Sequence, residues 1–151
     1  MAELRKIRRY EVRVDLAYDP ATHLWVERLD NGRVRIGMDP LGAETSGTLA
    51  QVSLVEAGTR VQRGEPLGMI EAEKFVGPVS SPLSGTVSLV NAGVAQDPSV
   101  IERDPYGAGW LVEFESVAGA ELDDLTQGAD TVATWFAEAV KDAERHGVLA
   151  L

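Results

Sequence analysis

The sequence predicts a mainly β domain with one α-helix near its C-terminal end, and three observations support this fold class. Residues 10–18, "YEVRVDLAY", alternate apolar and polar side chains with the period of two that a half-buried strand requires. "WVERLDNGRVRIGM" (25–38) places Asn31-Gly32 between two strand-like runs, which is the sequence signal of a β-hairpin. In contrast, "DTVATWFAEAVKDAERHG" (130–147) has apolar residues at helical spacing, so we expect a helix that packs on the β domain.

A near-repeat in the middle of the chain predicts two similar halves. "VSLVEAG" (52–58) and "VSLVNAG" (87–93) differ at one position, and a Ser-Gly-Thr sequence precedes each copy. Two strands with the same turn chemistry suggest halves related by a pseudo-twofold axis; chance similarity of two Val-rich strands is the alternative. The Gly-punctuated segment 39–47 before the first copy is expected to form a short helical turn.

The length of 151 residues fits a single domain, residues 1–151, with three parts. We expect a basic N-terminal arm and first strand over residues 1–15, a β core over 16–118 and a C-terminal helical extension over 119–151. The first 13 residues hold five basic and two acidic side chains. This arm could be a transit-like segment or a contact for an acidic partner, but a solvated segment that leads into the first strand is the favoured interpretation.

The composition excludes several classes of function. A net charge of −10 argues against nucleic acid as a partner, because phosphate binding requires a basic surface. The chain has no cysteine, which removes disulfides, thiolate nucleophiles and cysteine-based metal sites. Because no run approaches about 18 apolar residues, no membrane span is expected, and the cytoplasm is the default location.

The polar residues do not form a catalytic pattern. The two histidines, His23 and His146, lack metal-ligand spacing, and the glycines form no phosphate-binding motif. His23 is more typical of a capping or packing residue than of a general base. We therefore expect a carrier that has no catalytic residues and no metal site.

Lys74 is the candidate site of chemistry. It is one of three lysines in a chain with eleven arginines, and it lies in "IEAEKFVGP" (70–78) between two extended segments. A lysine at a hairpin tip suits covalent attachment, since amide formation requires an amine that can lose a proton and arginine cannot supply one. The alternative is a surface lysine that pairs with Glu71 or Glu73 and contributes little to stability.

Three segments carry a family resemblance. "GEPLGMIEAEK" (64–74), "SSPLSGTVSLVN" (80–91) and "ERDPYGAGWLVEF" (102–114) occur in the same order in the lipoyl carrier H-proteins of the glycine cleavage system. The chain resembles this family from about Tyr18 to Leu125. The resemblance implies a lipoyl-domain-like β-sandwich, or barrel-sandwich hybrid, with a short C-terminal helix.

The resemblance also implies a cofactor and its site. It makes Lys74 the residue that carries lipoate in amide linkage, and it matches Glu71 to the family's glutamate three positions earlier. "HLWV" (23–26) matches the family's early His-x-Trp, which places His23 near the cleft where the lipoyl arm rests.

The residues beside Lys74 depart from the family pattern. The usual Glu-Ser-Val-Lys followed by a small residue is here Glu71-Ala72-Glu73-Lys74-Phe75, so Glu73 and Phe75 are expected to change which enzymes dock. Biotin carriers have methionines on both sides of their lysine, so biotin is disfavoured. The departures, the basic arm and the long final helix look more like the H-protein-like lipoate-binding proteins of the sulfur-oxidising heterodisulfide-reductase-like pathway, which is the favoured function. A glycine cleavage H-protein that carries the methylamine group is the alternative, and a non-lipoylated adaptor is the second alternative.

These functions imply partners. A lipoate ligase or lipoyl-transfer enzymes would modify the lysine. A heterodisulfide-reductase-like complex, or the P-, T- and L-proteins of glycine cleavage, would exchange cargo with it. We expect the carrier itself to be a monomer.

Overall fold

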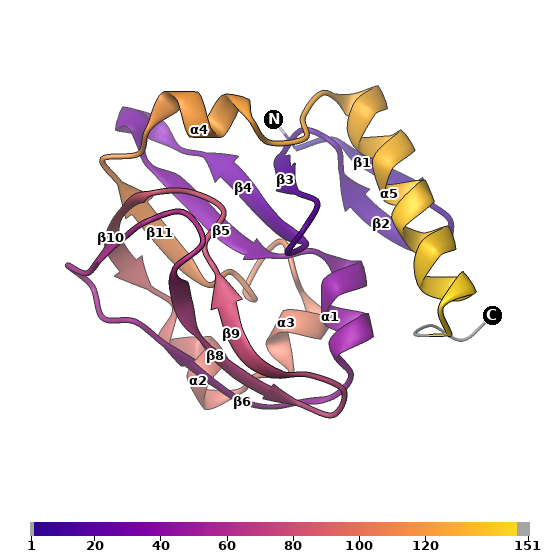
Figure 1. Cartoon of the computed structure of the whole chain (residues 1–151), viewed down its shortest axis with the longest axis horizontal. Helices are drawn as coiled ribbons and strands as arrows, with labels where there is room; N and C mark the ends of the chain where they lie inside the picture. Colours follow the sequence, from indigo (N-terminus) through magenta and orange to yellow (C-terminus); the bar gives the residue numbers. More distant parts are fainter. Residues whose placement is uncertain (1, 148–151) are drawn as a thin grey trace.

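The computed structural model describes residues 2–147 and shows three β-sheets with helices around them (Figure 1). The largest sheet has the strand order β3-β4-β5-β11-β10-β7, the second has the order β6-β8-β9, and β1 and β2 form a separate pair. The strands are β1 Leu4–Ile7, β2 Tyr10–Arg13, β3 Ala17–Asp19, β4 Leu24–Arg28, β5 Val34–Met38, β6 Leu49–Leu54, β7 Arg60–Val61, β8 Pro66–Ala72, β9 Val76–Ser80, β10 Gly85–Val90 and β11 Val112–Glu115. The helices are η1 Asp30–Gly32, α1 Pro40–Ser46, α2 Ala92–Gln96, α3 Val100–Arg103, α4 Gly119–Asp123 and α5 Ala129–Arg145. This arrangement confirms the mainly β fold with a C-terminal helix.

The β4–β5 hairpin forms where the sequence predicts it. Asn31 and Gly32 adopt φ values of 62° and 72°, the left-handed conformation that these two residue types tolerate best. Further along the hairpin, Trp25 pairs with Gly37. A Cβ atom on Gly37 would lie 2.3 Å from Cζ2 of Trp25, so the buried indole depends on glycine opposite it.

The main hydrophobic core lies between the six-stranded and three-stranded sheets. Its buried residues include Val26, Ile36 and Phe114 from the larger sheet and Val52 and Ile70 from the smaller sheet. Because apolar side chains of both sheets form one cluster, the two sheets pack as a β-sandwich. Burial of this shared face provides the main hydrophobic stabilisation of the fold.

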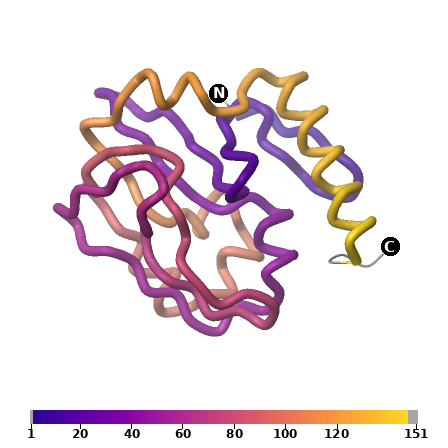
Figure 2. Tube along the Cα trace, viewed as in Figure 1, coloured from indigo at the N-terminus to yellow at the C-terminus, as the bar shows by residue number. Residues whose placement is uncertain are grey.

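The N-terminal residues form an ordered part of the fold, in contrast to the solvated arm that the sequence predicts. β1 and β2 pair from Leu4↔Arg13 to Ile7↔Tyr10 and lie beside α5, so the first and last described segments are neighbours (Figure 2). Val12 of β2 and Phe136 of α5 belong to a second hydrophobic cluster. The amphipathic helix supplies an apolar face, and this hairpin covers it.

The predicted strand over residues 10–18 is two strands in the structure. β2 ends at Arg13 and belongs to the two-stranded sheet, whereas β3 begins at Ala17 and pairs with β4 in the six-stranded sheet. Residues 14–16 connect the two sheets, and the backbone N–H of Val14 bonds to the carbonyl of Glu3 at 2.9 Å. Residues 10–18 do alternate apolar and polar side chains, but the alternation continues from β2 into β3 and does not mark the point where the chain changes sheet.

The two copies of the near-repeat form strands in different sheets. The first copy begins in β6 of the three-stranded sheet, and the second begins in β10 of the six-stranded sheet. The first copy is followed by a turn that leads into β7, whereas the second runs directly into α2 with Asn91 as its N-cap, so the matching sequences do not continue alike. Within residues 2–147, no helix is long and apolar enough to cross a membrane.

Candidate functional site

Lys74 lies at the connection between β8 and β9, as the sequence predicts. Glu71 of β8 pairs with Val76 of β9, and the backbone N–H of Ala72 donates to the carbonyl of Phe75 at 2.8 Å. Glu73 and Lys74 therefore form the tip of a tight hairpin. A tight tip presents the lysine with little backbone freedom, which reduces the entropy that a docking enzyme must remove.

The end of α1 holds this tip in place. The backbone N–H of Glu73 donates to the carbonyl of Thr48 at 2.9 Å, and the N–H of Lys74 donates to the carbonyl of Ser46 at 2.9 Å. The residue between these two acceptors, Gly47, has a φ of 77°. A Cβ atom on Gly47 would lie 2.9 Å from the Cβ of Glu73, so glycine permits both the turn and the close contact.

The side chain of Lys74 is exposed and has no ion-pair partner among the described residues of the chain. The alternative of a structural pair with Glu71 or Glu73 is therefore absent from this structure. Phe75 is 44% exposed, although its ring lies over Gly77, where a Cβ would be 3.0 Å from Cζ of the ring. The tip thus presents an amine, carboxylates and part of an aromatic ring together.

Two clefts lie beside the tip. The first, which we call the His23 cleft, has a volume of about 250 Å³, and its walls include His23, Met38, Ile70, Phe75 and Val79. The second, which we call the Glu44 cleft, has a volume of about 410 Å³, and its walls include Tyr10, Glu44, Gly47, Glu73, Lys74 and Glu102. The lining of the first cleft is more apolar than polar, and that of the second contains three glutamates beside Lys74. A further cleft of about 510 Å³ contains no residue of the tip, and its Arg13 pairs with Asp15 and Glu27.

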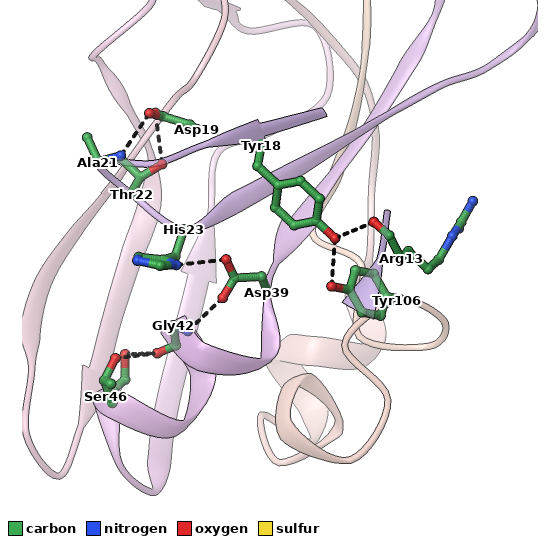
Figure 3. Close-up of polar contacts among 11 residues, drawn as sticks. Arg13, Tyr18, Asp19, Ala21, Thr22, His23, Asp39, Gly42, Ser46 and Tyr106 are labelled. Atoms are coloured by element: carbon green, nitrogen blue, oxygen red, sulfur yellow. Dashed lines mark hydrogen bonds and ion pairs between the residues drawn. The ribbon is translucent and has the colours of Figure 1, made fainter. Parts of the chain in front are cut away.

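His23 is fixed from two sides. Its Nδ1 lies 2.8 Å from Oδ2 of Asp39 (Figure 3), and its ring stacks on Trp135 of α5 at a centroid distance of 5.3 Å. Burial opposes protonation of His23, but the hydrogen bond and charge of Asp39 outweigh it and raise the pKa of the imidazole. The structure therefore combines the packing role expected of His23 with a place in the wall of the cleft.

Asp39 connects His23 to α1. It is fully buried, and its Oδ1 accepts from the backbone N–H of Gly42 at 2.8 Å as the N-cap of the helix (Figure 3). Pro40 follows at the first helical position, where its missing N–H has no cost. These residue types explain why a helix of one to two turns begins at this point.

Two tyrosines, the buried Tyr18 and the partly buried Tyr106, connect the loop before β11 to the sheet. The hydroxyl of Tyr18 donates to the carbonyl of Arg13 at 2.7 Å and lies 2.7 Å from the hydroxyl of Tyr106 (Figure 3). Burial raises the pKa of both phenols, so they remain neutral hydrogen-bonding groups. This contact stabilises the segment "DPYG" without reaching the tip.

The anchoring residues are those that the sequence did not reveal. Ser46 and Thr48 contribute main-chain carbonyls, for which residue type carries no signal, and Glu44 belongs to a helix predicted only as a short turn. Gly47 lies within the Ser-Gly-Thr sequence, which by itself indicates only a turn before a strand. Among residues 2–147, no group of three or more His, Cys, Asp or Glu side chains could hold a metal ion.

Comparisons with known proteins identify the family. The sequence pattern described as "Glycine cleavage H-protein" matches residues 16–138. The glycine cleavage system H protein of Bifidobacterium longum is 44% identical over 62% of this chain and 67% of its own length. That of Prochlorococcus marinus is 40% identical over 69% of this chain and 80% of its own length.

A solved structure agrees with the sequence relatives. The crystal structure of a glycine cleavage system H protein from Mycobacterium marinum matches with a TM-score of 0.68 and 32% identity, over 82% of this chain and 98% of that one. This match confirms the lipoyl-domain-like β-sandwich that the resemblance implied. The chain therefore belongs to the glycine cleavage H-protein family.

Proposed function

We propose that this protein is a lipoyl carrier, with lipoate amide-linked to Lys74, that transports the methylamine group of glycine cleavage. The observation that carries the proposal is the exposed amine of Lys74, which has no ion pair within the described residues. It lies at a hairpin tip held by main-chain hydrogen bonds, in a chain of this family. No side chain of the described residues competes for the amine through an ion pair. A modifying enzyme can therefore reach it without breaking an internal contact.

The residues at the tip fit the cofactor. Lipoate supplies the dithiol that accepts and releases the transported group, so this cysteine-free chain does not need sulfur chemistry of its own. The amine of Lys74 provides the attachment point. Ile70, Phe75 and Val79 give the His23 cleft an apolar wall that suits a hydrocarbon arm.

The other site residues have supporting roles in this proposal. His23 forms part of the cleft wall with its ring held by Asp39. Glu71 and Glu73 place negative charge beside Lys74, and Phe75 adds apolar area that a docking enzyme can cover. The net charge of −10 favours encounter with enzymes whose docking surfaces are basic.

The comparisons favour the glycine cleavage alternative over the sulfur-oxidation function that the sequence favoured. The relatives reported above are named for glycine cleavage, and none of these findings supports a heterodisulfide-reductase-like partner. We therefore propose the P-, T- and L-proteins as exchange partners and a lipoate ligase or lipoyl-transfer enzymes as modifying partners. Glu73 and Phe75 then distinguish this carrier within the family.

Intact-mass spectrometry of the protein from its native host, followed by tryptic mapping, tests the proposal. Modification of Lys74 blocks cleavage after it, so the lipoylated form should yield a single peptide over residues 64–103. The Lys74→Arg variant should carry no lipoyl mass increment. If Lys74 is unmodified in cells that lipoylate their other carriers, the carrier function is wrong and the adaptor alternative replaces it; modification at another lysine would overturn the site.

A further inference from the structure

The short helix α1 connects the Lys74 tip to the rest of the molecule. Its first turn is fixed by Asp39, whose side chain accepts from the N–H of Gly42. Its last residue, Ser46, and Thr48 just beyond it supply the carbonyls that hold the tip. In Figure 1, α1 lies between the β8–β9 hairpin and the unit formed by β1, β2 and α5. A helix this short has little stability of its own, so its position depends on side chains that fix it.

Glu44, in the middle of α1, is held by the N-terminal hairpin. Its Oε2 accepts from Nη2 of Arg9 at 2.6 Å and also from the hydroxyl of Tyr10. Burial and then the hydrogen bond to Glu44 raise the pKa of Tyr10 far above its ordinary value, so the phenol remains the donor. Arg9 and Tyr10 precede the family match, which begins at residue 16.

Tyr10 is itself fixed from the opposite side. The residue is only 7% exposed, and its ring meets the ring of Phe136 of α5 edge-on at a centroid distance of 5.6 Å. The guanidinium of Arg9 lies 5.0 Å from the centroid of the Tyr10 ring. Tyr10 is therefore held by the second hydrophobic cluster, whereas the side chain of Arg9 is exposed and lies against the Tyr10 ring.

The link continues from Glu44 to the tip through hydrogen bonds. The carbonyl of Glu44 accepts from the N–H of Gly47 at 3.1 Å, and Gly47 separates the two carbonyls that anchor Glu73 and Lys74. Tyr10, Glu44, Gly47 and Lys74 also share the walls of the Glu44 cleft. A movement of Glu44 therefore moves the acceptors of the tip.

We propose that Glu44 is a positioning residue for Lys74, through which the N-terminal hairpin restrains the hairpin tip that enzymes must engage. The kinetic part of this inference rests on the proposed lipoyl carrier function. Residues 9 and 10 are then part of the machinery that presents the lysine, in a segment outside the family match. Their loss loosens the tip while the β-sandwich stays folded.

Three variants and one matched control test the proposal. Glu44→Ala removes both contacts, Glu44→Gln retains an acceptor for Tyr10, and Tyr10→Phe removes one hydroxyl while keeping the ring against Phe136. The control, Arg8→Gln, breaks the pair between Arg8 and Glu144, which ties the same hairpin to α5 but not to α1. The Glu44 side chain is 40% exposed, so its replacements are expected to fold.

Amide hydrogen exchange and lipoylation kinetics are the measurements. In Glu44→Ala, exchange at the amides of Glu73 and Lys74 should accelerate about two- to fivefold, the range expected for loss of partly exposed charged contacts. With a lipoate ligase, lipoate and ATP, the KM for the carrier should rise by a similar factor at unchanged kcat, because a looser tip costs more to order on docking. In Glu44→Gln and in Tyr10→Phe, the increases in amide exchange and in KM should be smaller than in Glu44→Ala. In Arg8→Gln, both quantities should stay at the wild-type values.

Two results would overturn the proposal. One is unchanged exchange at these two amides in folded Glu44→Ala; the other is equal acceleration in Arg8→Gln, which would indicate general loosening of the hairpin. If the ligase does not modify Lys74 of the wild type, the proposed function fails. The exchange measurement on the unmodified protein still decides the positioning role.

Discussion

The variant Gly47→Ala tests whether Gly47 positions the hairpin tip that carries Lys74. The substitution adds one Cβ atom beside the carbonyls to which the tip is hydrogen-bonded. The residue has φ of 77° and ψ of −168°, a region of backbone space that is essentially restricted to glycine. The added Cβ would lie 2.9 Å from both Cβ and Oε1 of Glu73 and 3.3 Å from Cγ of Lys74. The carboxylate can rotate away, but the Cβ of Glu73 moves only with the backbone of the tip.

The expected cost has two parts. A non-glycine residue in this conformation costs about 1–3 kcal/mol, and the contact with Glu73 adds about 1 kcal/mol, as overpacking does where backbone must shift. We therefore expect Gly47→Ala to lower the free energy of unfolding by about 2–4 kcal/mol. The same shift displaces the tip, so the rate of lipoylation at Lys74 should fall about fivefold, the factor that corresponds to about 1 kcal/mol.

Gly58→Ala is the matched control. Gly58 has a φ of 93°, and a Cβ there would meet no atom within 4 Å, so the substitution strains the backbone without touching the tip. Urea unfolding should show a loss of about 1–3 kcal/mol, while the lipoylation rate under folded conditions stays at the wild-type value. If Gly47→Ala matches Gly58→Ala in both assays, the contact between Gly47 and the tip does not position the lysine.

Single contacts elsewhere give three more expectations. Lys74→Arg should abolish lipoylation by mass spectrometry yet change the free energy of unfolding by less than about 0.5 kcal/mol, since the side chain is exposed and unpaired; lipoylation elsewhere would refute the site. Because Asp39 raises the pKa of His23 above 6.5, this histidine stabilises the fold at pH values below its unfolded pKa, and the contribution is lost as pH rises through its folded pKa. The difference in unfolding free energy between wild type and His23→Asn should thus be larger near about pH 5.5 than near about pH 8.5, and equal differences would contradict this. Glu113→Ala should lower the free energy of unfolding in urea by about 2 kcal/mol, because the 3% exposed carboxylate accepts three hydrogen bonds from Arg33 and Arg35. The two arginines are partly exposed, which keeps the cost below that of a fully buried ion pair. A change under about 0.5 kcal/mol would refute this expectation.

The elements that the sequence predicted correctly depend on local chemistry. The Asn31-Gly32 turn needs left-handed backbone at both positions, and no other part of the fold is required to specify it. The helical period of α5 and the Asp-Pro start of α1 are likewise local signals. The position of Lys74 at a hairpin tip is also a local prediction, because two extended segments flank the residue in sequence.

The elements that the sequence missed depend on contacts between distant segments. The N-terminal hairpin is stable because α5, more than 100 residues later, covers its apolar face. No local pattern in residues 1–9 distinguishes a paired strand from a solvated arm. The break in the strand at residues 14–16 has the same origin, since the chain changes sheet where both pairing partners lie far away in sequence. The anchor of the lysine tip is invisible for another reason, because main-chain acceptors can belong to any residue type.

The basic residues of the N-terminal segment have different partners in the expected solvated arm and in the observed hairpin. As a solvated arm, its five basic residues would offer a contact for an acidic partner. In the structure, Arg5 pairs with Asp130, Arg8 with Glu144 and Arg9 with Glu44, so these charges neutralise acidic groups of the same molecule. Glu71 and Glu73 beside Lys74 are exposed and form no ion pair within the described residues, so the tip carries negative charge of its own. Its enzymes should present basic docking surfaces, and association should slow as ionic strength rises, because screening weakens steering between opposite charges.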